Sequence, residues 1–279
     1  MPVIVSPGFR LPADVDPVVS PDGRLTVILD AAHAGVLLRA DYSDDNSVIK
    51  VRFERSDGTI VRSGDPAWAP GGWAHAYDHE ATLGGGTSWR AVPILADGTE
   101  GTPSDYVTAA IPALTDGHVW LKPAHAPDLA LKMPLQPQDF DYATRTDATP
   151  IAGSRYPTAT WDVLQAPTSQ ITVITRDRQT EKALLALLDQ GPILGQWPPC
   201  AGVEDHYFLP DKIASEELHW DGYPMRRWTI GTITIARPAT TESALIIPGL
   251  SYDTVAADFD TYDQVAEQVE SYNRLLEVS

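Results

Sequence analysis

Prolines and glycines occur too often along this chain to favour long helices. Of the 279 residues, 24 are proline and 20 are glycine. Proline removes a backbone donor and its ring clashes with the preceding helical turn, so this density favours short strands joined by turns. Asp-Gly between alternating segments predicts the tight turn of a β-hairpin. The chain has five such pairs: Asp22-Gly23, Asp57-Gly58, Asp97-Gly98, Asp116-Gly117 and Asp221-Gly222. The sequence therefore predicts a mainly β protein.

The first part of the chain has the pattern of a β-sandwich. Its strand-like segments are rich in β-branched residues and alternate in polarity, as half-buried strands do. These segments cover residues 24–29, 35–40, 48–54, 59–62, 88–95 and 105–111. Short strands separated by turns at this spacing predict a sandwich over residues 20–114, preceded by an extended segment over residues 1–19.

Part of this sandwich resembles the second half of a fibronectin type III domain. Residues 83–112 supply a leucine, a turn of three glycines, an aromatic residue six positions after the leucine, a strand, a glycine turn and a last strand. In that family the aromatic residue is usually a tyrosine whose hydroxyl bonds back to the turn. Here it is Trp89, which can only donate, through its indole nitrogen. The family's early-strand tryptophan is also missing, with Leu37 and Leu38 in that region. The resemblance implies a fold but no function.

The sequence pattern of residues 115–238 predicts a second β domain. A strand opens it near residue 118, and a loop follows. Further strand-like segments lie at 159–164, 170–175, 193–197, 206–209 and 225–236. Together with the helix described next, they indicate a β-sandwich or barrel with one flanking helix.

The predicted helix follows the strand that ends at Thr175. Its sequence, EKALLALLDQG, contains an apolar stripe formed by Leu184, Leu185, Leu187 and Leu188. Gly191 and Pro192 end the helix, because glycine favours the position after a helix and proline cannot continue it. We expect this helix to pack against the strands of the second domain.

The second domain resembles minor tail proteins of long-tailed phages that infect actinobacteria. The similar parts are VWLKPAHAPDLALKM, the strand and helix ITVITRDRQTEKALLALLDQGPIL, a Tyr-Phe strand and the closing RRWTIGTITIARP. The resemblance implies a distal-tail or tail-tube-like β-sandwich that forms a homo-oligomeric ring, with hexamer or trimer symmetry, at the tip of the virion tail. It also implies synthesis in the host cytoplasm and contacts with tail tube, tape measure and baseplate hub proteins. Leu184 and Leu188 are the residues of this domain that we expect to matter for assembly.

The C-terminal segment, residues 239–279, contains a ten-residue repeat of the form [S/T]-Y-[D/N]-x-[V/L]. Its repeated residues are Tyr252, Tyr262, Tyr272, Val255, Val265 and Leu275. Ten residues advance a helix by about −80°, so the tyrosines do not share one face of a single helix. Three short N-capped turns and one amphipathic helix from about residue 256 both fit the pattern. We expect an arm that binds a neighbouring subunit through these residues; the alternative is an arm folded back on its own sandwich.

Composition argues against several classes of protein. A net charge of −18 without a run of Lys or Arg is unsuited to nucleic-acid binding. No stretch is apolar for long enough to span a membrane, and the first residues lack the pattern of a secretory signal. The single cysteine, Cys200, cannot form an intramolecular disulfide, and we expect it to be buried beside Pro198 and Pro199.

No motif indicates a catalytic centre, a metal site or a bound cofactor. His75 and His79 have the spacing of a helical zinc site, but i and i+4 lie about 13 Å apart in a strand, so we expect surface histidines. Asp44-Asp45-Asn46 lacks the spaced oxygen ligands of a calcium loop and predicts a polar hairpin tip. Gly84–Gly86 has no following helix, which argues against a phosphate cradle.

A carbohydrate- or receptor-binding module is the main alternative function. Such a module could use Trp68, Trp73 and Tyr77, which we expect to be exposed, as a stacking platform for a ligand. Binding by a stable monomer would distinguish it from a ring-forming subunit.

A glycoside hydrolase is a third hypothesis. Glu216 and Glu217 lie next to Trp220 and Tyr223 in the sequence, and paired carboxylates beside aromatic rings suit acid–base cleavage of a sugar. An exposed loop is the simpler interpretation of the same residues.

Overall fold

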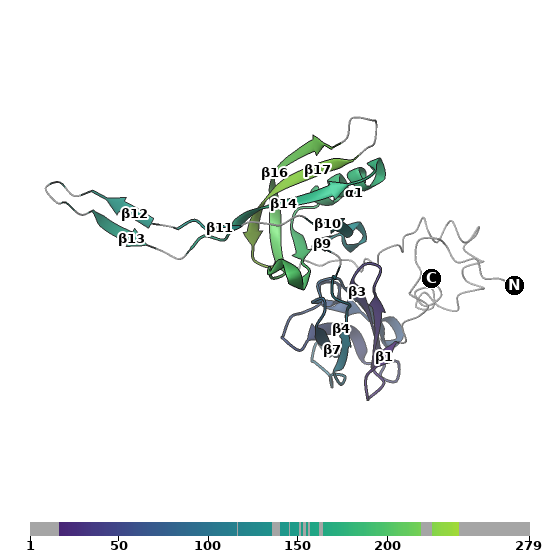
Figure 1. The fold of residues 1–279 in the computed structure, drawn as a ribbon. Helices are drawn as coiled ribbons and strands as arrows, with labels where there is room; N and C mark the ends of the chain where they lie inside the picture. Colours follow the sequence, from purple (N-terminus) through teal and green to yellow (C-terminus); the bar gives the residue numbers. More distant parts are fainter. Residues whose placement is uncertain are drawn as a thin grey trace. The chain divides into compact units, whose positions relative to one another are not determined.

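The structure is a computed structural model of the full chain, and in it the protein is mainly β with one α-helix among the described residues (Figure 1). The described residues are 17–115, 117–135, 140–144, 146–150, 152, 155, 157–161, 164–218 and 225–239. They divide into two compact units. Unit 1 contains residues 17–114, His125–Ala130 and Ala239, whereas unit 2 contains Thr115–Ala124 and Leu131–Pro238.

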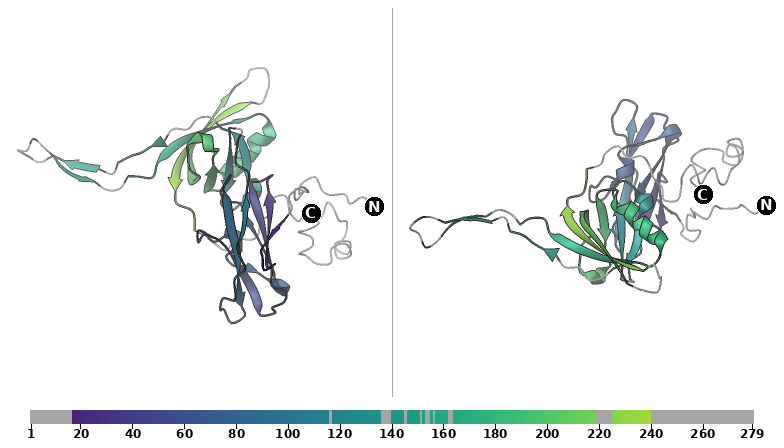
Figure 2. Two further views of the ribbon diagram at one scale, coloured as in Figure 1. Left: turned by 60° about the horizontal axis from the view of Figure 1, so that its bottom comes forward. Right: turned by 90° about the horizontal axis from the view of Figure 1, so that it is seen from above.

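Unit 1 is built from two four-stranded antiparallel sheets that face each other (Figure 2). The first has the order β1-β2-β3-β6, and its strands are Val18–Val19, Leu25–Asp30, Gly35–Asp41 and Trp73–Asp78. The second has the order β5-β4-β7-β8, and its strands are Ala67–Trp68, Val48–Arg55, Gly86–Leu95 and Val107–Ala110. Side chains such as Leu25, Leu38 and Phe53 are fully buried and fill the core. The sandwich predicted for residues 20–114 thus has the expected β architecture.

Three strands of unit 1, the short β1 and β5 and the longer β6, were not predicted, and one predicted strand is nearly absent. The segment 59–62 contributes only an isolated bridge, between Ile60 and Glu54, before a 3₁₀ turn at Arg62–Gly64. Strand β6 instead lies at Trp73–Asp78 and pairs with β3 along its whole length. Its sequence, WAHAYD, lacks β-branched residues and follows two glycines, so the local signal for a strand was weak.

The prediction that His75 and His79 lie on the surface is wrong. Both are buried, His75 within β6 and His79 directly after it. Burial, and next the charge of Arg39, lower the pKa of His75 to about 4. His75 is therefore a neutral side chain of the folded unit at neutral pH, which its polar sequence context did not indicate.

Trp89 donates through its indole nitrogen, as its side chain requires. The residue is fully buried in β7, and its Nε1 lies 2.8 Å from Oδ2 of Asp78. The same carboxylate accepts a hydrogen bond from Nε of Arg55 at 2.8 Å and a second one from the Arg55 guanidinium. The Glu80 backbone amide also donates to it, at 3.0 Å. The Trp89 indole is therefore bonded to a buried ion pair.

Unit 2 contains a seven-stranded antiparallel sheet with the order β10-β9-β15-β16-β17-β14-β11. In that order the strands are Leu131–Pro134, His118–Pro123, Ile193–Gln196, His206–Glu217, Arg226–Ile235, Thr168–Thr175 and Phe140–Asp141. An isolated bridge joins Leu135, after β10, to Val173 in β14, so the sheet curls back on itself. The strands predicted near 118 and at 170–175, 193–197, 206–209 and 225–236 all belong to this sheet.

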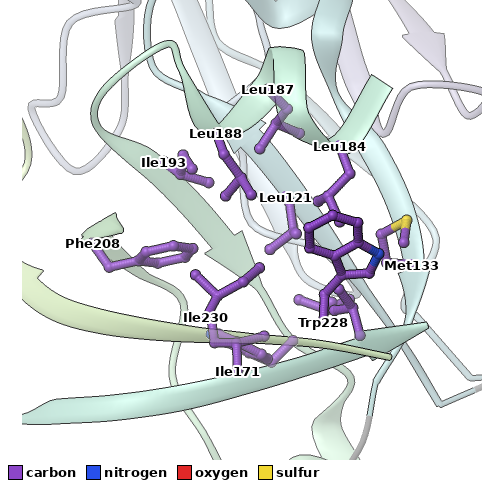
Figure 3. Close-up of a cluster of buried hydrophobic side chains, with 13 residues drawn as sticks. Leu121, Met133, Ile171, Leu184, Leu187, Leu188, Ile193, Phe208, Trp228 and Ile230 are labelled. Atoms are coloured by element: carbon purple, nitrogen blue, oxygen red, sulfur yellow. The ribbon is translucent and has the colours of Figure 1, made fainter. Parts of the chain in front are cut away.

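The helix α1, Arg178–Leu188, packs on the concave side of this sheet (Figure 3). Asp177 caps its N-terminus by accepting a hydrogen bond from the Thr180 amide at 2.7 Å. Leu184, Leu187 and Leu188 are buried in a cluster with side chains of six strands, which include Leu121, Met133, Ile171, Ile193, Phe208 and Trp228. Gly191 has a φ of +87°, which suits the glycine predicted to end the helix. The predicted helix and its apolar stripe are confirmed, except that Leu185 is exposed.

A separate two-stranded sheet lies between β11 and β14 in the sequence. Its strands, β12 at Thr146–Thr149 and β13 at Thr158–Trp161, pair antiparallel with each other. The amide of Gln165 donates to the Ala143 carbonyl at 3.0 Å, which links the two chain segments below this pair. With the β11–β14 pair they form one ribbon (Figure 1). At about 3.3 Å per residue, the eight steps from Asp141 to Thr149 give it a length of about 26 Å.

Candidate assembly surfaces

The outward side of strands β14, β17 and β16 has few charged residues. Cross-strand partners form one row from Thr168, Ile233 and Leu209, and a second from Thr172, Thr229 and Ala214. Residues that alternate with these, such as Ile171 and Ile230, are fully buried on the opposite side. We call the two rows the threonine–isoleucine face.

Apolar side chains of this face are left exposed to solvent. Ile233 is 41% exposed and Leu209 is 37% exposed. Asp211 and Lys212 are exposed in the bulge of β16 between the two rows, and at the next row Arg227 Nη1 lies 3.2 Å from Oε2 of Glu216. A β surface with exposed branched side chains and few charges is suited to contact with another protein surface.

The ribbon that contains β12 and β13 is a second candidate. Two-stranded sheets are marginally stable in water on their own, because each strand has only one neighbour. Tyr142 and Leu164, beside the base of the pair, are 62% and 59% exposed. A partner surface against the ribbon would bury these side chains and satisfy its strand edges.

The stacking platform predicted in unit 1 is only partly present. Trp68 is 71% exposed on strand β5, and Trp73 is half-buried with the Arg39 guanidinium 5.4 Å from its ring centre. Tyr77, however, is buried, and its hydroxyl donates to Oδ2 of Asp30 at 2.8 Å. The expectation that Tyr77 is exposed is wrong, because β6 places its ring in a packed position.

Another aromatic side chain is exposed on the same sheet as Trp68. Tyr106 is 45% exposed, and the Arg90 guanidinium lies 5.4 Å from its ring centre. Lys50 Nζ lies 4.5 Å from the Trp68 ring in a similar way. Arg52 stands between these pairs on β4. We call Trp68, Tyr106, Lys50, Arg52 and Arg90 the cation–aromatic face.

Two acidic side chains hold the arginines at the centre of this face in place. Glu54 accepts hydrogen bonds from Arg52 at 2.7 Å and from Arg90 at 2.7 Å. Arg52 also pairs with Glu100 at 2.8 Å. The Glu54 carboxyl is partly buried, which alone would raise its pKa, but the two arginines lower it. The guanidinium groups are therefore held in fixed positions.

The residues predicted to matter for assembly fall into two groups: some are in the core of unit 2, and the others lie outside the described residues. Leu184 and Leu188 are in the core of unit 2, so they can influence assembly through the stability of that unit rather than by touching a partner. The repeat residues of the C-terminal segment lie outside the described part of the chain. Sequence reasoning missed the threonine–isoleucine face, although the alternation in TIGTITI contains the signal for it.

The residues considered for chemistry occupy ordinary structural positions. Asp44 is exposed and Asp45 is half-buried in a polar turn between β3 and β4; the prediction of a hairpin tip is wrong, because these strands belong to different sheets. Cys200 is exposed, and the expectation that it is buried is wrong, because the chain turns there in a 3₁₀ helix at Pro199–Ala201. Glu216 and Glu217 are exposed at the end of β16 rather than in a loop. Their aromatic neighbours in the sequence, Trp220 and Tyr223, lie outside the described residues.

Asp205 is the carboxyl most suited to acid–base chemistry in unit 2. Burial raises its pKa. Its Oδ1 accepts a hydrogen bond from the Trp197 amide at 3.0 Å, and its Oδ2 lies 3.4 Å from Nε2 of Gln196. These contacts hold the turn between β15 and β16 in place, so the Asp205 carboxyl has a structural role. Within the described ranges, no group of three or more His, Cys, Asp or Glu could hold a metal ion.

Comparison with known proteins gives no family for this chain. No family model matches the sequence, and no curated protein matches it. Among the residues that the structure describes, no helix is both long and apolar enough to cross a membrane.

Proposed function

We propose that this chain is a structural minor tail protein of a long-tailed phage, and that unit 2 forms or completes an oligomeric ring at the tail tip. The sequence resemblance supplies the kind of assembly. The observation that carries the proposal is the threonine–isoleucine face, where exposed branched side chains form two uncharged rows across three strands.

A ring contact of this kind follows from the physical character of the face. Interfaces between copies of one chain are more apolar than ordinary surface, and charged residues are depleted at their centres. The two rows themselves contain no charged residue; Asp211 and Lys212 lie in the bulge between them, and the Arg227–Glu216 pair lies at their rim. The β12–β13 ribbon adds a length of about 26 Å that could reach across a neighbouring subunit.

In this proposal, unit 1 is a fibronectin type III-like domain that decorates the ring. Two features support that assignment. Strands β1, β2, β3 and β6 form one antiparallel sheet and strands β5, β4, β7 and β8 form the other, so unit 1 has the two sheets of a β-sandwich. The aromatic residue at the start of β7 is buried and bonds back towards the turn after β6, through Asp78. The proposed partners are further copies of this chain and the neighbouring tail proteins.

Native mass spectrometry of the purified full chain tests the proposal. Ile233→Glu places a charge at the centre of the threonine–isoleucine face and should abolish oligomers and co-assembly with tail proteins. Leu185→Glu is a matched control, because Leu185 is also 41% exposed but lies on α1, away from that face. A wild-type chain that stays monomeric and binds no tail protein would overturn the proposal. Equal loss of assembly in both variants would show that the threonine–isoleucine face is not the assembly surface.

A further inference from the structure

The cation–aromatic face of unit 1 has a charge balance opposite to that of the whole chain. The chain has 38 acidic residues and 20 Lys or Arg. On this face, by contrast, Lys50, Arg52 and Arg90 outnumber the two carboxylates, Glu54 and Glu100. An acidic partner would therefore be attracted to this face more than to the rest of the surface.

The same face exposes two aromatic rings that are already held in place. Trp68 is 71% exposed and Tyr106 is 45% exposed, and a cation lies over each ring. Rings held in this way lose little conformational freedom on binding. Trp68 lies on β5 and Tyr106 directly before β8, at the two edges of the four-stranded sheet; the registers place Trp68 opposite Lys50 and Tyr106 at the level of Arg90, so the rings also lie at different heights along the strands. A partner that suits this face carries both carboxylates and apolar or aromatic side chains.

Residues 240–279 of this chain have that composition. They contain eight Asp or Glu and one Arg, a net charge of −7. They also contain three tyrosines and a phenylalanine: Tyr252, Phe259, Tyr262 and Tyr272. A segment of 40 residues can reach any part of a sandwich of this size.

The residue from which this segment starts is fixed to unit 1. Arg62 Nη1 donates to the carbonyl of Ala239 at 3.1 Å, while Nε and Nη2 of Arg62 donate to Glu80 at 3.0 and 2.8 Å. Arg62 lies in the chain between Ile60, which bridges to Glu54, and Trp68, which pairs with Lys50. The segment therefore begins beside the edge of β4, whose outward residues form the centre of the cation–aromatic face.

We propose that residues 240–279 bind the cation–aromatic face of their own unit 1. Carboxylates of the segment pair with Lys50, Arg52 and Arg90, and its aromatic side chains pack against Trp68 and Tyr106. Because the segment is tethered at Ala239, its effective concentration at the face is on the order of millimolar even in dilute solution. The sequence alone favoured binding to a neighbouring subunit; the bond from Arg62 to Ala239 is the observation that favours the alternative. This inference is independent of ring formation by unit 2.

Zero-length cross-linking of the full chain tests this inference. A carbodiimide joins a lysine amine to a carboxylate only when the two are in contact. Lys50 should become linked to acidic residues of 240–279, whereas exposed Lys212 on β16 should not, and 1 M NaCl should reduce the Lys50 link several-fold. An equal mixture of ¹⁵N-labelled and unlabelled chains identifies the copy that supplies the segment. Links within one isotope support the proposal. Absence of a Lys50 link overturns it, and so do links found only between isotopes.

A chain that ends at Ala239 provides the second measurement. If the segment covers the face, its removal should increase acrylamide quenching of Trp68, obtained as the difference between each chain and its Trp68→Phe variant. A charge reversal, Lys50→Glu with Arg90→Glu, should raise quenching in the full chain to the same level. Identical quenching of Trp68 in the full and shortened chains would contradict the proposal, whatever the oligomeric state of unit 2.

Discussion

Replacing Asp78 by alanine should strongly destabilise unit 1. The side chain is 2% exposed and accepts four hydrogen bonds, two from Arg55, one from Trp89 and one from the Glu80 amide. Without the carboxylate, the Arg55 guanidinium is left as a buried charge whose main partner is gone. Removing one partner of a buried ion pair costs about 3–5 kcal/mol.

The same ion pair predicts that the stability of unit 1 depends on pH. Burial alone would raise the pKa of Asp78, but the charge and hydrogen bonds of Arg55, with the Trp89 bond, lower it to about 2. An unfolded aspartate titrates near pH 3.9, so the unfolded chain binds the proton first. The stabilisation is complete above about pH 4 and is lost as the pH falls towards 2. A shift of nearly two pKa units corresponds to about 2 kcal/mol.

Pulsed hydrogen exchange of peptides from β6 and β7 across a urea series measures the free energy of unfolding of unit 1. Trp89→Phe is the control, because it removes one donor and part of a buried ring but leaves the ion pair, so it should cost about 2 kcal/mol. The argument would be refuted by an Asp78→Ala variant that loses less than about 1 kcal/mol, or no more than Trp89→Phe.

Three further outcomes are expected. Leu184→Ala should destabilise unit 2 by about 2–5 kcal/mol, since its side chain is fully buried, whereas Leu185→Ala should lower the melting temperature little; equal effects would contradict the packing of α1. His75 has a pKa lowered by burial to about 4, so unit 1 should lose stability as the pH falls from about 6.5 to 4, and His75→Gln should flatten that part of a urea-stability profile. A fragment of residues 118–279 should fold alone, because unit 2 has its own core, and an unfolded circular dichroism spectrum would count against that boundary.

Local signals were sufficient for the features of unit 2 that depend on neighbouring residues. The helix followed from a leucine stripe and a terminal glycine followed by proline, and α1 has both the buried stripe and the glycine after its end. Strands such as β14 and β17 followed from alternation of β-branched residues. What alternation did not reveal was which side would be covered, because the burial of Ile171 and Ile230 depends on α1 and on strands far away in the sequence.

Burial in unit 1 was harder to predict, because it depends on long-range polar contacts. Tyr77 and His75 are polar enough to suit a surface, yet Tyr77 is held by Asp30, which lies 47 positions earlier. The β12–β13 pair was only half predicted, since two prolines and a glycine between the strands favoured a loop. Cys200 was predicted to be buried, because a small apolar residue suits a core. It is exposed because it lies on a turn.

Imaging of labelled particles is the most direct test of the central claim. The chain would carry a small epitope tag after residue 279, be produced from its native locus, and be located by immunogold electron microscopy on purified particles. The account predicts gold at the tip of the tail, in a constant number per particle, and loss of that label from particles made with Ile233→Glu but not with Leu185→Glu. Gold that is absent from the particles, or that lies only on the head or along the tail, would contradict it.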